Sequence, residues 1–414
     1  MPSAPTPTTV AHDARAWIQA NWDPALSLVA WRRLLLHSGW ACPSWPSDWY
    51  GRGLPTWAGR IVAAELTSAG AVGVPPGGGM ALAAPTILIH GDDDLKRLLL
   101  ARTITGEDTW CQLFSEPGSG SDLAGLTTTA NRDGDEWVIN GQKLWSTSAH
   151  HADYGMLLAR TNWDVPKHLG ITWIVLPMHQ PGVEARRVRQ MNGHASFNEV
   201  FLTDARAPVD HTVGRPGDGW TVARTTLAHE RGFASVRRQK FDVSGGRALR
   251  EAEAEAAAHF ETYRWYPQRA GRVDLVVDHV RTAGRNQEPV ARQAVAKALS
   301  LQRAHQWTGQ RATDNRAVGR SPGPEGSLGK LGLSEVARSA AHVHSLLAGA
   351  SGMLTGPQSP FEGVIAEVLT SVPAQSIAGG TDEVQHNIIG DRVLGLPREL
   401  EPDRDLPFRE IRRR

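Results

Sequence analysis

A loop rich in glycine and serine is a first candidate for binding chemistry. In CQLFSEPGSGSDLAGL (111–126), Gly118, Gly120 and Ser121 form a flexible stretch with many backbone N–H donors. Such loops hold phosphate oxygens, especially beside the start of a helix. The spacing is not the dinucleotide fingerprint, because the third glycine is misplaced and no strand–helix–strand pattern surrounds it. Taken alone, the loop predicts either a phosphate contact or an ordinary turn.

Two residues of the following segment could face a flat ligand. In INGQKLWSTSA (139–149), Trp145 offers an apolar plane and Thr147 offers a hydroxyl. This pair suits a planar heteroaromatic ligand, because such sites combine apolar surface with a few polar groups. The alternative for Trp145 is a tryptophan in the core of a strand.

A pair of glycines near the C-terminus suggests a second contact with a ligand. In SIAGGTDEVQ (376–385), Gly379 and Gly380 precede Thr381 and two acidic residues. Glycine tolerates unusual backbone angles and has no Cβ, so a ligand can approach the backbone closely here. The segment has the composition of a catalytic site in which the catalytic side chain is missing.

A carboxylate elsewhere lies on an apolar helical stripe. In GWTVARTTLAHERGF and the residue that follows it, spacings of three and four connect Trp220, Ala223, Leu227, Glu230 and Ala234. Burial on that stripe would raise the pKa of Glu230 and make it a stronger base. The alternative is a structural ion pair between Glu230 and Arg231, because buried acids are usually paired.

The elements that position these residues change in kind along the chain. Residues 1–107 mix proline and glycine with helical segments such as WAGRIVAAEL from Trp57 and DDLKRLLLARTI from Asp93. Residues 108–218 carry strand signals, with hairpin-type dipeptides at 133–134 (Asp-Gly) and 140–141 (Asn-Gly). We therefore expect an N-terminal helical domain followed by a small barrel or sandwich.

Helical patterns return in residues 219–414. Runs at 251–258 and 295–307 are helical, as is LGLSEVARSAAHVHSLLAG, and together they predict a helix bundle. The apolar stripe of that last segment consists of Leu333, Val336, Ala340, Val343 and Leu347. The charged tail EPDRDLPFREIRRR (401–414) is expected to be solvated or to contact another subunit. The segment ITWIVLPM from Ile171, in the preceding domain, is typical of a buried strand.

Composition narrows the class of protein. The chain has 414 residues, 41% of them apolar, and a net charge of +1, so no global field favours nucleic acid or an anionic membrane. Its two cysteines, Cys42 and Cys111, form no disulfide framework or zinc site, which favours a reducing cytoplasm. We expect no signal peptide, no membrane insertion and no metal site.

Together these segments resemble the acyl-CoA dehydrogenase family of flavoproteins. The matching pieces are SEPGSGSDLAG, NGQKLWSTSA, MLLAR, GVEARRVRQMNGHASFNEVFLTDARAPVD, AHERG and IAGGTDEVQHNIIGDRVLGLPRE, in the family's order. The resemblance spans residues 15–400. It implies an α+β multidomain fold: an N-terminal helical domain, a central small β-barrel and a C-terminal four-helix bundle, with FAD between barrel and bundle.

The resemblance also implies a reaction and a cofactor site. Family members remove a proton from the α-carbon of an acyl-CoA thioester and pass a hydride from the β-carbon to flavin N5, which gives a trans-2-enoyl-CoA. The positions implied for FAD binding are Phe114, Ser115, Gly120, Ser121, Trp145, Thr147, Arg285, Thr381 and Glu383. Arg285 matches an arginine that extends toward the FAD of a neighbouring subunit; an exposed arginine at a helix end is the alternative.

The position of the catalytic base departs from the common pattern. Much of the family carries a glutamate in Tyr-Glu-Gly-Thr, whereas residues 378–381 here are Ala-Gly-Gly-Thr. A branch that includes isovaleryl-CoA and long-chain dehydrogenases places the base in a helical Glu-Arg pair, which matches Glu230. The resemblance therefore implies Glu230 as base and the backbone N–H of Gly379 as donor to the enolate oxygen.

Substrate contacts are implied at Ser121, Arg231 and Gly380. An aspartate often found three residues before the family's arginine is Ala228 here, so the CoA contact of Arg231 stays open. The missing side chains at 378 and 379 favour a branched or bulky acyl chain, such as a steroid side chain, over a small linear one.

The resemblance implies three kinds of partner: an acyl-CoA substrate, an electron-transferring flavoprotein, and further subunits in a homotetramer or dimer. The short AGRNQEPVARQ segment resembles actinobacterial members, some of which pair unlike subunits, so a heterotetramer is an alternative. An acyl-CoA oxidase is another alternative. One branch of this fold binds DNA, but the near-neutral charge argues against that function here.

Overall fold

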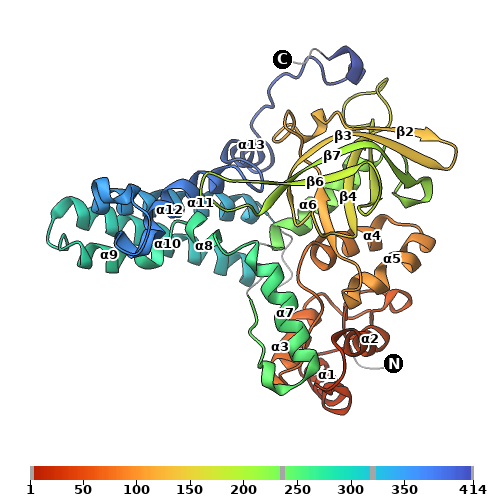
Figure 1. Cartoon of the computed structure of the whole chain (residues 1–414), viewed down its shortest axis with the longest axis horizontal. Coiled ribbons are helices and arrows are strands. Elements are labelled where there is room, and N and C mark those ends of the chain that lie inside the picture. Colours follow the sequence, from red (N-terminus) through yellow and green to blue (C-terminus); the bar gives the residue numbers. More distant parts are fainter. Residues whose placement is uncertain (1–3, 234–237, 318–322, 412–414) are drawn as a thin grey trace. The chain divides into compact units, whose positions relative to one another are not determined.

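The computed structural model describes residues 4–233, 238–317 and 323–411 (Figure 1). The chain forms two compact units, each of which combines segments that are distant in sequence. Unit 1 contains residues 1–188, 196–262 and 402–414, and unit 2 contains residues 189–195 and 263–401.

The α-helices of unit 1 precede and follow its strands in the sequence. They are α1 (Pro7–Asn21), α2 (Leu28–Ser38), α3 (Ala58–Ser68), α4 (Ala84–His90), α5 (Asp93–Thr105), α6 (Gly219–Phe233) and α7 (Arg247–Glu261). The boundaries of α2 and α5 follow from their capping residues. Ser27 and Asp92 accept backbone hydrogen bonds at the two N-termini, and Gly39 and Gly106 end the helices in the left-handed conformation.

Unit 1 contains a single sheet of eight strands within its described residues. The strands are β1 (Trp110–Leu113), β2 (Thr129–Asp133), β3 (Glu136–Thr147), β4 (Tyr154–Arg160), β5 (Ile171–Pro177), β6 (Val183–Val188), β7 (Phe197–Pro208) and β8 (Thr212–Val213). Their order is β6-β7-β3-β2-β4-β5-β8, with β1 beside β4. The long β3 and β7 are antiparallel, whereas β1 and β4 are parallel.

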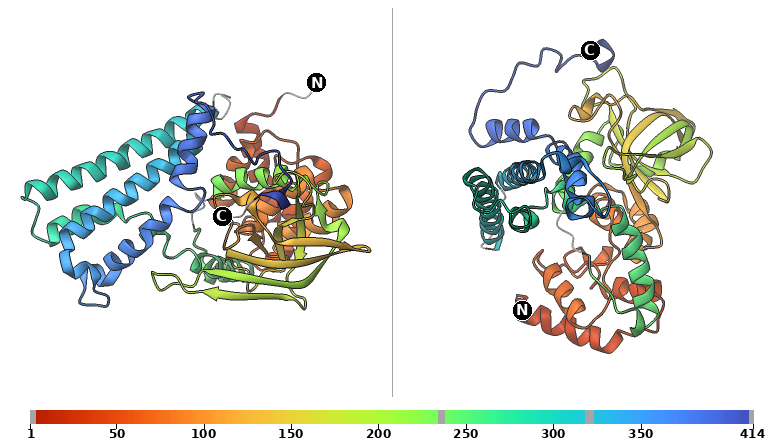
Figure 2. Two further views of the ribbon diagram at one scale, coloured as in Figure 1. Left: turned by 90° about the horizontal axis from the view of Figure 1, so that it is seen from above. Right: turned by 60° about the vertical axis from the view of Figure 1, so that its left-hand side comes forward.

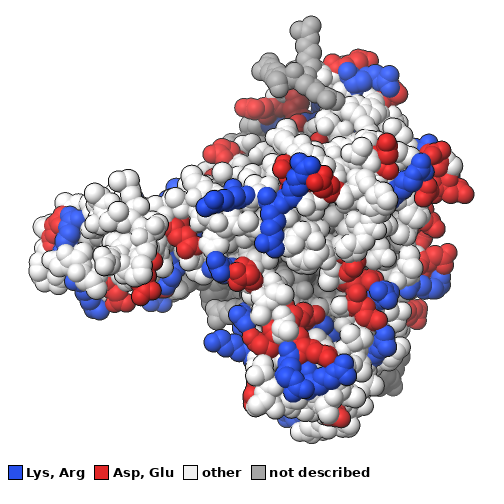
Figure 3. All heavy atoms as spheres, viewed as in Figure 1, with Lys and Arg blue, Asp and Glu red and all other residues white. Residues whose placement is uncertain are grey.

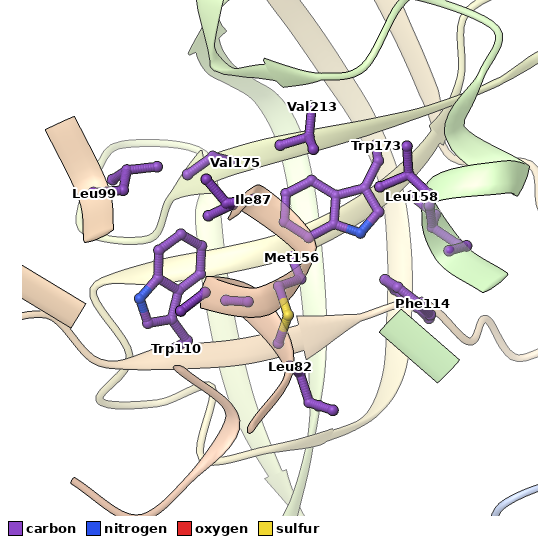
Figure 4. Packing of buried hydrophobic residues seen from close by; sticks show 14 of the residues in the cluster. Leu82, Ile87, Leu99, Trp110, Phe114, Met156, Leu158, Trp173, Val175 and Val213 are labelled. Carbon is purple, nitrogen blue, oxygen red and sulfur yellow. The ribbon is translucent and has the colours of Figure 1, made fainter. Parts of the chain in front are cut away.

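Strand β4 is buried on both faces, which explains its continuous apolar sequence. Met156 and Leu158 belong to a core shared with α4, α5 and α6, part of which Figure 4 shows. Leu157 and Ala159 point to the opposite face and join a second core inside the sheet. Side chains alternate along a strand, so this single strand supports both cores.

Unit 2 is helical throughout its described elements. It contains α8 (Tyr266–Arg269), α9 (Val276–Thr282), α10 (Pro289–Ala317), α11 (Glu325–Ala348), α12 (Val364–Ser371) and α13 (Asp382–Arg392), joined by short 3-10 turns. Helices α10 and α11 lie side by side (Figure 2). Their shared core includes Ala291, Ala298, Ala340, Val343 and Leu347.

The expected order of a helical region, a sheet and a second helical region is confirmed. The Asp-Gly turn at 133–134 is also confirmed, because it joins β2 to β3 and Gly134 has φ 60°. The turn expected at 140–141 is wrong, since both residues lie inside β3 next to a bulge. Helices α6 and α7 follow the expected boundary at residue 218, yet their contacts place them in unit 1.

Most of the C-terminal tail is exposed, as expected, but one of its residues is buried. Its residues 402–411 belong to unit 1, and the side chain of Phe408 is buried there. The tail contains one buried aromatic residue among many charged ones. Composition alone does not show that this residue anchors the tail. The intervening residues 393–401 are all exposed.

Surface charge, helix length and possible metal ligands were the subject of expectations from composition. Figure 3 shows acidic and basic side chains interspersed on the visible face. Across the described helices, none combines the length and apolar character that a membrane crossing requires. The described residues also contain no group of three histidine, cysteine or acidic side chains that could hold a metal ion.

Candidate functional site

A bulge in β3 turns Trp145 outward. The ladder with β7 has one extra residue between Lys143 and Ser146, so Leu144 and Trp145 oppose a single partner. Trp145 has φ 65°, a conformation that costs a non-glycine residue about 1–3 kcal/mol. The residue is 54% exposed, and its indole meets Phe197 edge to face at 5.7 Å between ring centroids. An exposed aromatic on strained backbone is typical of a ligand-binding position.

The loop of residues 115–127, called the 115–127 loop below, is anchored by a buried ion pair. The Lys143 ammonium lies 2.9 Å from Glu116 Oε1 and also donates to the Phe114 carbonyl at 3.1 Å. Glu116 in turn accepts from the backbone N–H groups of Thr127 and Thr128 at 2.7 and 2.8 Å. One carboxylate therefore ties the start of the loop to its end.

The charge of Glu116 is stabilised by these contacts. Burial alone would raise the pKa of Glu116, but the Lys143 ammonium and the hydrogen bonds outweigh it and lower the pKa to about 2. Burial lowers the pKa of the Lys143 ammonium, and the neighbouring carboxylate opposes that shift. Both side chains are almost fully buried, so this pair holds the loop and is not accessible for proton transfer.

Arg160 forms a second anchor beneath the same loop. Its guanidinium is buried and donates to the carbonyls of Ala124 at 2.7 Å, Leu126 at 3.2 Å and Lys167 at 3.0 Å. Two of these carbonyls belong to the 115–127 loop. Cations on β3 and β4 therefore hold the loop from both of its ends.

The loop residues implied for cofactor binding lie in two environments. Phe114 is buried in the first core, and the half-buried Ser115 accepts a hydrogen bond from Leu144 N–H at 2.9 Å. Gly120 and Ser121 are exposed, and a Cβ added to Gly120 would meet no atom within 4 Å. The loop therefore has an open tip on a rigid base.

These residues fit a flavin nucleotide. The outward indole of Trp145 supplies an apolar plane, and the half-buried hydroxyl of Thr147 lies two residues away on β3. The open tip around Gly120 leaves room for phosphate oxygens to approach the backbone. The backbone hydrogen bond from Leu144 N–H to the Ser115 carbonyl joins the base of the loop to β3 within unit 1.

Glu230 lies on α6 beside the strand that enters this loop. Its carboxylate is half-buried, and Gln112 of β1 donates from Nε2 to Glu230 Oε2 at 3.3 Å. Ala223 is buried in the first core, and Trp220 and Leu227 pack against it, so the expected stripe is confirmed for its described members. Ala234 lies outside the described residues, as does the side chain of Arg231. The raised pKa expected for Glu230 stays a prediction.

The second glycine-rich turn belongs to unit 2. Gly379 and Gly380 have φ of 71° and 87°, and a Cβ added to Gly379 would meet no atom within 4 Å. Gln385 donates to the Gly379 carbonyl at 3.3 Å. Thr381 caps α13 by accepting from the Val384 backbone N–H. The turn therefore exposes backbone that carries no side chain.

The acids after this turn have different surroundings. Asp382 is buried and accepts from Lys330 at 2.7 Å, Ser334 at 2.8 Å and Arg338 at 2.5 Å. Burial would raise the pKa of Asp382, but these donors outweigh it and lower the pKa below its usual range. Glu383 is exposed, and a backbone hydrogen bond at the start of α13 lowers its pKa. Asp382 thus anchors α13 to α11.

Arg285 follows α9 in unit 2 and contacts its own unit. Its guanidinium donates to Glu288 at 2.5 and 2.6 Å and to the Leu346 carbonyl at 2.5 Å. These contacts hold the side chain against the start of α10 and the end of α11. A role for Arg285 toward the cofactor of another subunit stays a prediction.

Sequence reasoning missed the anchoring residues Glu116, Lys143 and Arg160. Their signal is a charged residue within or directly beside an apolar strand, as in the quoted segments NGQKLWSTSA and MLLAR. A charge at an inward-facing strand position requires a buried partner. Which partner it finds depends on pairing across the sheet, which those segments do not specify.

Models of three domains of one family match the chain in sequence. They are described as the acyl-CoA dehydrogenase N-terminal domain over residues 8–107, the middle domain over 111–205 and the C-terminal domain over 263–394. Together they cover most of the chain, and the middle domain contains the bulge and the 115–127 loop.

Two relatives that match most of the chain carry the same description, and a solved structure has a similar fold. The chain is 35% identical over 376 residues to acyl-CoA dehydrogenase IpdE1 of Mycobacterium tuberculosis, covering 89% of this chain and 88% of the relative. It is 32% identical over 385 residues to IpdE1 of Mycolicibacterium smegmatis, covering 90% and 88%. A chain of the solved ChsE4-ChsE5 complex from Mycobacterium tuberculosis is 26% identical, with a TM-score of 0.62 and coverage of 96% and 100%.

Proposed function

The chain belongs to the acyl-CoA dehydrogenase family of oxidoreductases, and from this premise we propose that it oxidises an acyl-CoA thioester to the trans-2-enoyl-CoA with Glu230 as the base. The observation that carries the proposal is the position of Glu230. Its carboxylate accepts a hydrogen bond from Gln112, two residues before Phe114 and the 115–127 loop. Asp382, the first acid in sequence after the vacant family position at 379, is instead bonded to Lys330 and Arg338.

FAD is the proposed cofactor, and it would supply the hydride acceptor when bound. Trp145 and Thr147 would contact its ring, and the open tip of the 115–127 loop would contact its pyrophosphate. Arg285, Thr381 and Glu383 are further proposed contacts, the first of them toward a neighbouring subunit. The anchors beneath the loop would keep its N–H donors fixed before the cofactor arrives.

Glu230 would take the α-proton at its carboxylate, while a backbone N–H stabilises the enolate oxygen. Gly379 is proposed for that N–H, because its exposed backbone lacks a side chain that would block approach. The open space at the Cβ position of Gly379 supports a branched or bulky acyl chain as the substrate. Ser121, Arg231 and Gly380 are the further proposed substrate contacts.

The test is Glu230→Gln, assayed against linear, branched and steroid-side-chain acyl-CoAs with an artificial electron acceptor. Because a general base contributes about 10²–10⁴-fold, kcat should fall by that factor while FAD binding stays unchanged. Glu184→Gln is the matched control, since Glu184 lies on the exposed face of β6. A Glu230→Gln enzyme that keeps most of its activity would show that another group is the base.

A heteromeric assembly is a second candidate, favoured by the similarity to the ChsE4-ChsE5 complex. In that case a related subunit would complete the FAD site. Measuring FAD per subunit after purification of this chain alone separates the two assemblies. A fully loaded yellow protein supports the homotetramer or dimer, and a colourless protein supports the heterotetramer.

The proposed electron acceptor is an electron-transferring flavoprotein. An acyl-CoA oxidase would instead pass electrons to O₂. If hydrogen peroxide forms in proportion to the substrate consumed, with no acceptor protein present, the enzyme is an oxidase.

A further inference from the structure

We propose that Phe408, in the C-terminal tail, is a positioning residue for the 115–127 loop and acts through the guanidinium of Arg160. The proposal rests on the proposed function in one respect: that the loop contacts FAD. It adds a residue that lies outside the segments matched by the family models, the last of which ends at residue 394.

The tail is seated on unit 1 by several contacts. The Phe408 N–H donates to the Val165 carbonyl at 2.9 Å, and the Arg409 N–H donates to the Trp163 carbonyl at 3.1 Å. Arg409 also forms an ion pair with Asp164 at 2.5 Å. The backbone after β4 therefore receives the tail through two main-chain hydrogen bonds and one surface ion pair.

The Phe408 ring covers the Arg160 guanidinium. The ring centroid lies 3.5 Å from Arg160 Cζ, and the Trp163 ring lies 5.6 Å from the same atom. Both Phe408 and Arg160 are buried. A desolvated guanidinium over an aromatic face is attracted by the ring quadrupole and shielded from water by the ring.

Arg160 connects the Phe408 ring to the loop. Its donors bind the Ala124 and Leu126 carbonyls, directly before the Thr127 and Thr128 N–H groups that bind Glu116. Removing the ring would admit water to the guanidinium, and water would compete for its hydrogen bonds to these carbonyls. The end of the loop would then open more often, although no loop residue has changed.

Two substitutions at Phe408 distinguish the effect of the aromatic ring from the effect of burying any apolar side chain. Phe408→Leu keeps an apolar side chain and removes the ring face, whereas Phe408→Tyr keeps the ring. Leu406→Ala is the control, since Leu406 is an exposed residue of the same tail. Each variant is measured as the purified full chain without added cofactor, by amide hydrogen exchange of the peptide covering residues 115–128.

In Phe408→Leu, exchange of the 115–128 peptide should be about thirtyfold faster than in the wild type, the factor expected for a lost desolvated cation–π contact. The rate should be unchanged in Phe408→Tyr and Leu406→Ala. Exchange across α10 and α11 should be the same in all four proteins, which a general loss of stability would not produce. Titration with FAD should then show weaker binding for Phe408→Leu alone, with a dissociation constant that is larger by a similar factor.

Unchanged exchange of the 115–128 peptide in Phe408→Leu would overturn the proposal, as would equal acceleration in Phe408→Tyr. Accelerated exchange with an unchanged FAD dissociation constant would overturn the link to the cofactor. The exchange measurement needs no cofactor or substrate, so it succeeds or fails independently of the Glu230→Gln assay.

Discussion

Unit 1 and unit 2 each present a glycine-rich turn, and each turn is held by a buried carboxylate, but the two carboxylates are anchored differently. Glu116 of unit 1 binds one fully buried lysine and two backbone N–H groups. Asp382 of unit 2 binds Lys330 and Arg338, and the side chain of Arg338 is 44% exposed. The first anchor is closed to water and the second is partly open to it.

This difference shows that an acid beside a ligand-binding turn need not be a catalyst. Glu116 and Asp382 both have a pKa held low by cations and hydrogen bonds, which suits holding backbone and not accepting a proton near neutral pH. Glu230, the proposed base, is half-buried on α6 and accepts a hydrogen bond from the amide of Gln112. The following predictions test the contrast between the two anchors.

The largest effect is expected from Lys143→Met in unit 1. The change leaves Glu116 buried without its cation, which should lower the free energy of unfolding by about 3–5 kcal/mol. Urea denaturation followed by tryptophan fluorescence measures the loss. Lys167→Met is the control, because Lys167 pairs with the largely exposed Asp122 and should lose at most about 1 kcal/mol. Equal losses would mean that burial does not distinguish the unit 1 anchor.

A smaller effect is expected from Asp382→Asn in unit 2. The amide can still accept hydrogen bonds but leaves Lys330 and Arg338 without their shared carboxylate, so stability should fall by about 1–3 kcal/mol. Thermal unfolding measures this loss, and Glu383→Gln at the adjacent exposed position is the control. If Asp382→Asn destabilised the protein more than Lys143→Met, the ranking of the two anchors would be reversed.

Acid should weaken unit 2 through a buried histidine pair. His279 and His344 share a hydrogen bond of 2.9 Å between their Nδ1 atoms. Burial and the neighbouring His344 lower the pKa of His279 to about 4, and burial also lowers the pKa of His344. The unfolded chain therefore binds protons first as the pH falls below 6.5, and stability declines toward pH 4.

The variant His279→Gln tests this pH dependence. It should reduce the loss of stability between pH 7 and pH 5 by about 1–2 kcal/mol, because one titrating group is removed. Melting temperatures at the two pH values give the comparison, with the exposed His386→Gln as control. A wild-type-like pH slope in His279→Gln would assign the acid sensitivity to other groups.

The smallest effect is expected at the unit 2 turn itself. Gly379→Ala adds a methyl group into open space, so only the left-handed backbone at φ 71° opposes it, at about 1 kcal/mol. Gly329→Ala, at an uncrowded position within α11, should instead stabilise by about 0.5–1 kcal/mol. Calorimetry of both variants should give shifts of opposite sign; a stabilising Gly379→Ala would contradict the φ assigned to this turn.

Local patterns predicted the regular elements well. The Asp-Gly turn at 133–134 and the apolar stripe from Val336 to Leu347 depend on neighbours in sequence, and the structure contains both. The Asn-Gly dipeptide at 140–141 failed because pairing between β3 and β7 overrides a local turn preference. A bulge depends on the register between two paired strands, so the sequence of one strand alone does not predict it.

The candidate site was predictable where a residue's own chemistry marks it. Trp145 and the glycines could be named as candidates from the sequence because an aromatic plane and bare backbone are useful to a ligand by themselves. Glu116, Lys143, Arg160 and Phe408 were missed because each acts only through a partner that is remote in sequence. Phe408 is the extreme case, since it lies 248 residues from Arg160 (408 minus 160).

The placement of the tail also sets an order for biosynthesis. Residues 402–411 complete unit 1, yet they follow the whole of unit 2 in the chain. A ribosome therefore releases every helix of unit 2 before the last aromatic side chain of unit 1 is available. The cover over Arg160 can form only after that point, so the 115–127 loop reaches its final packing only after unit 2 has been synthesised.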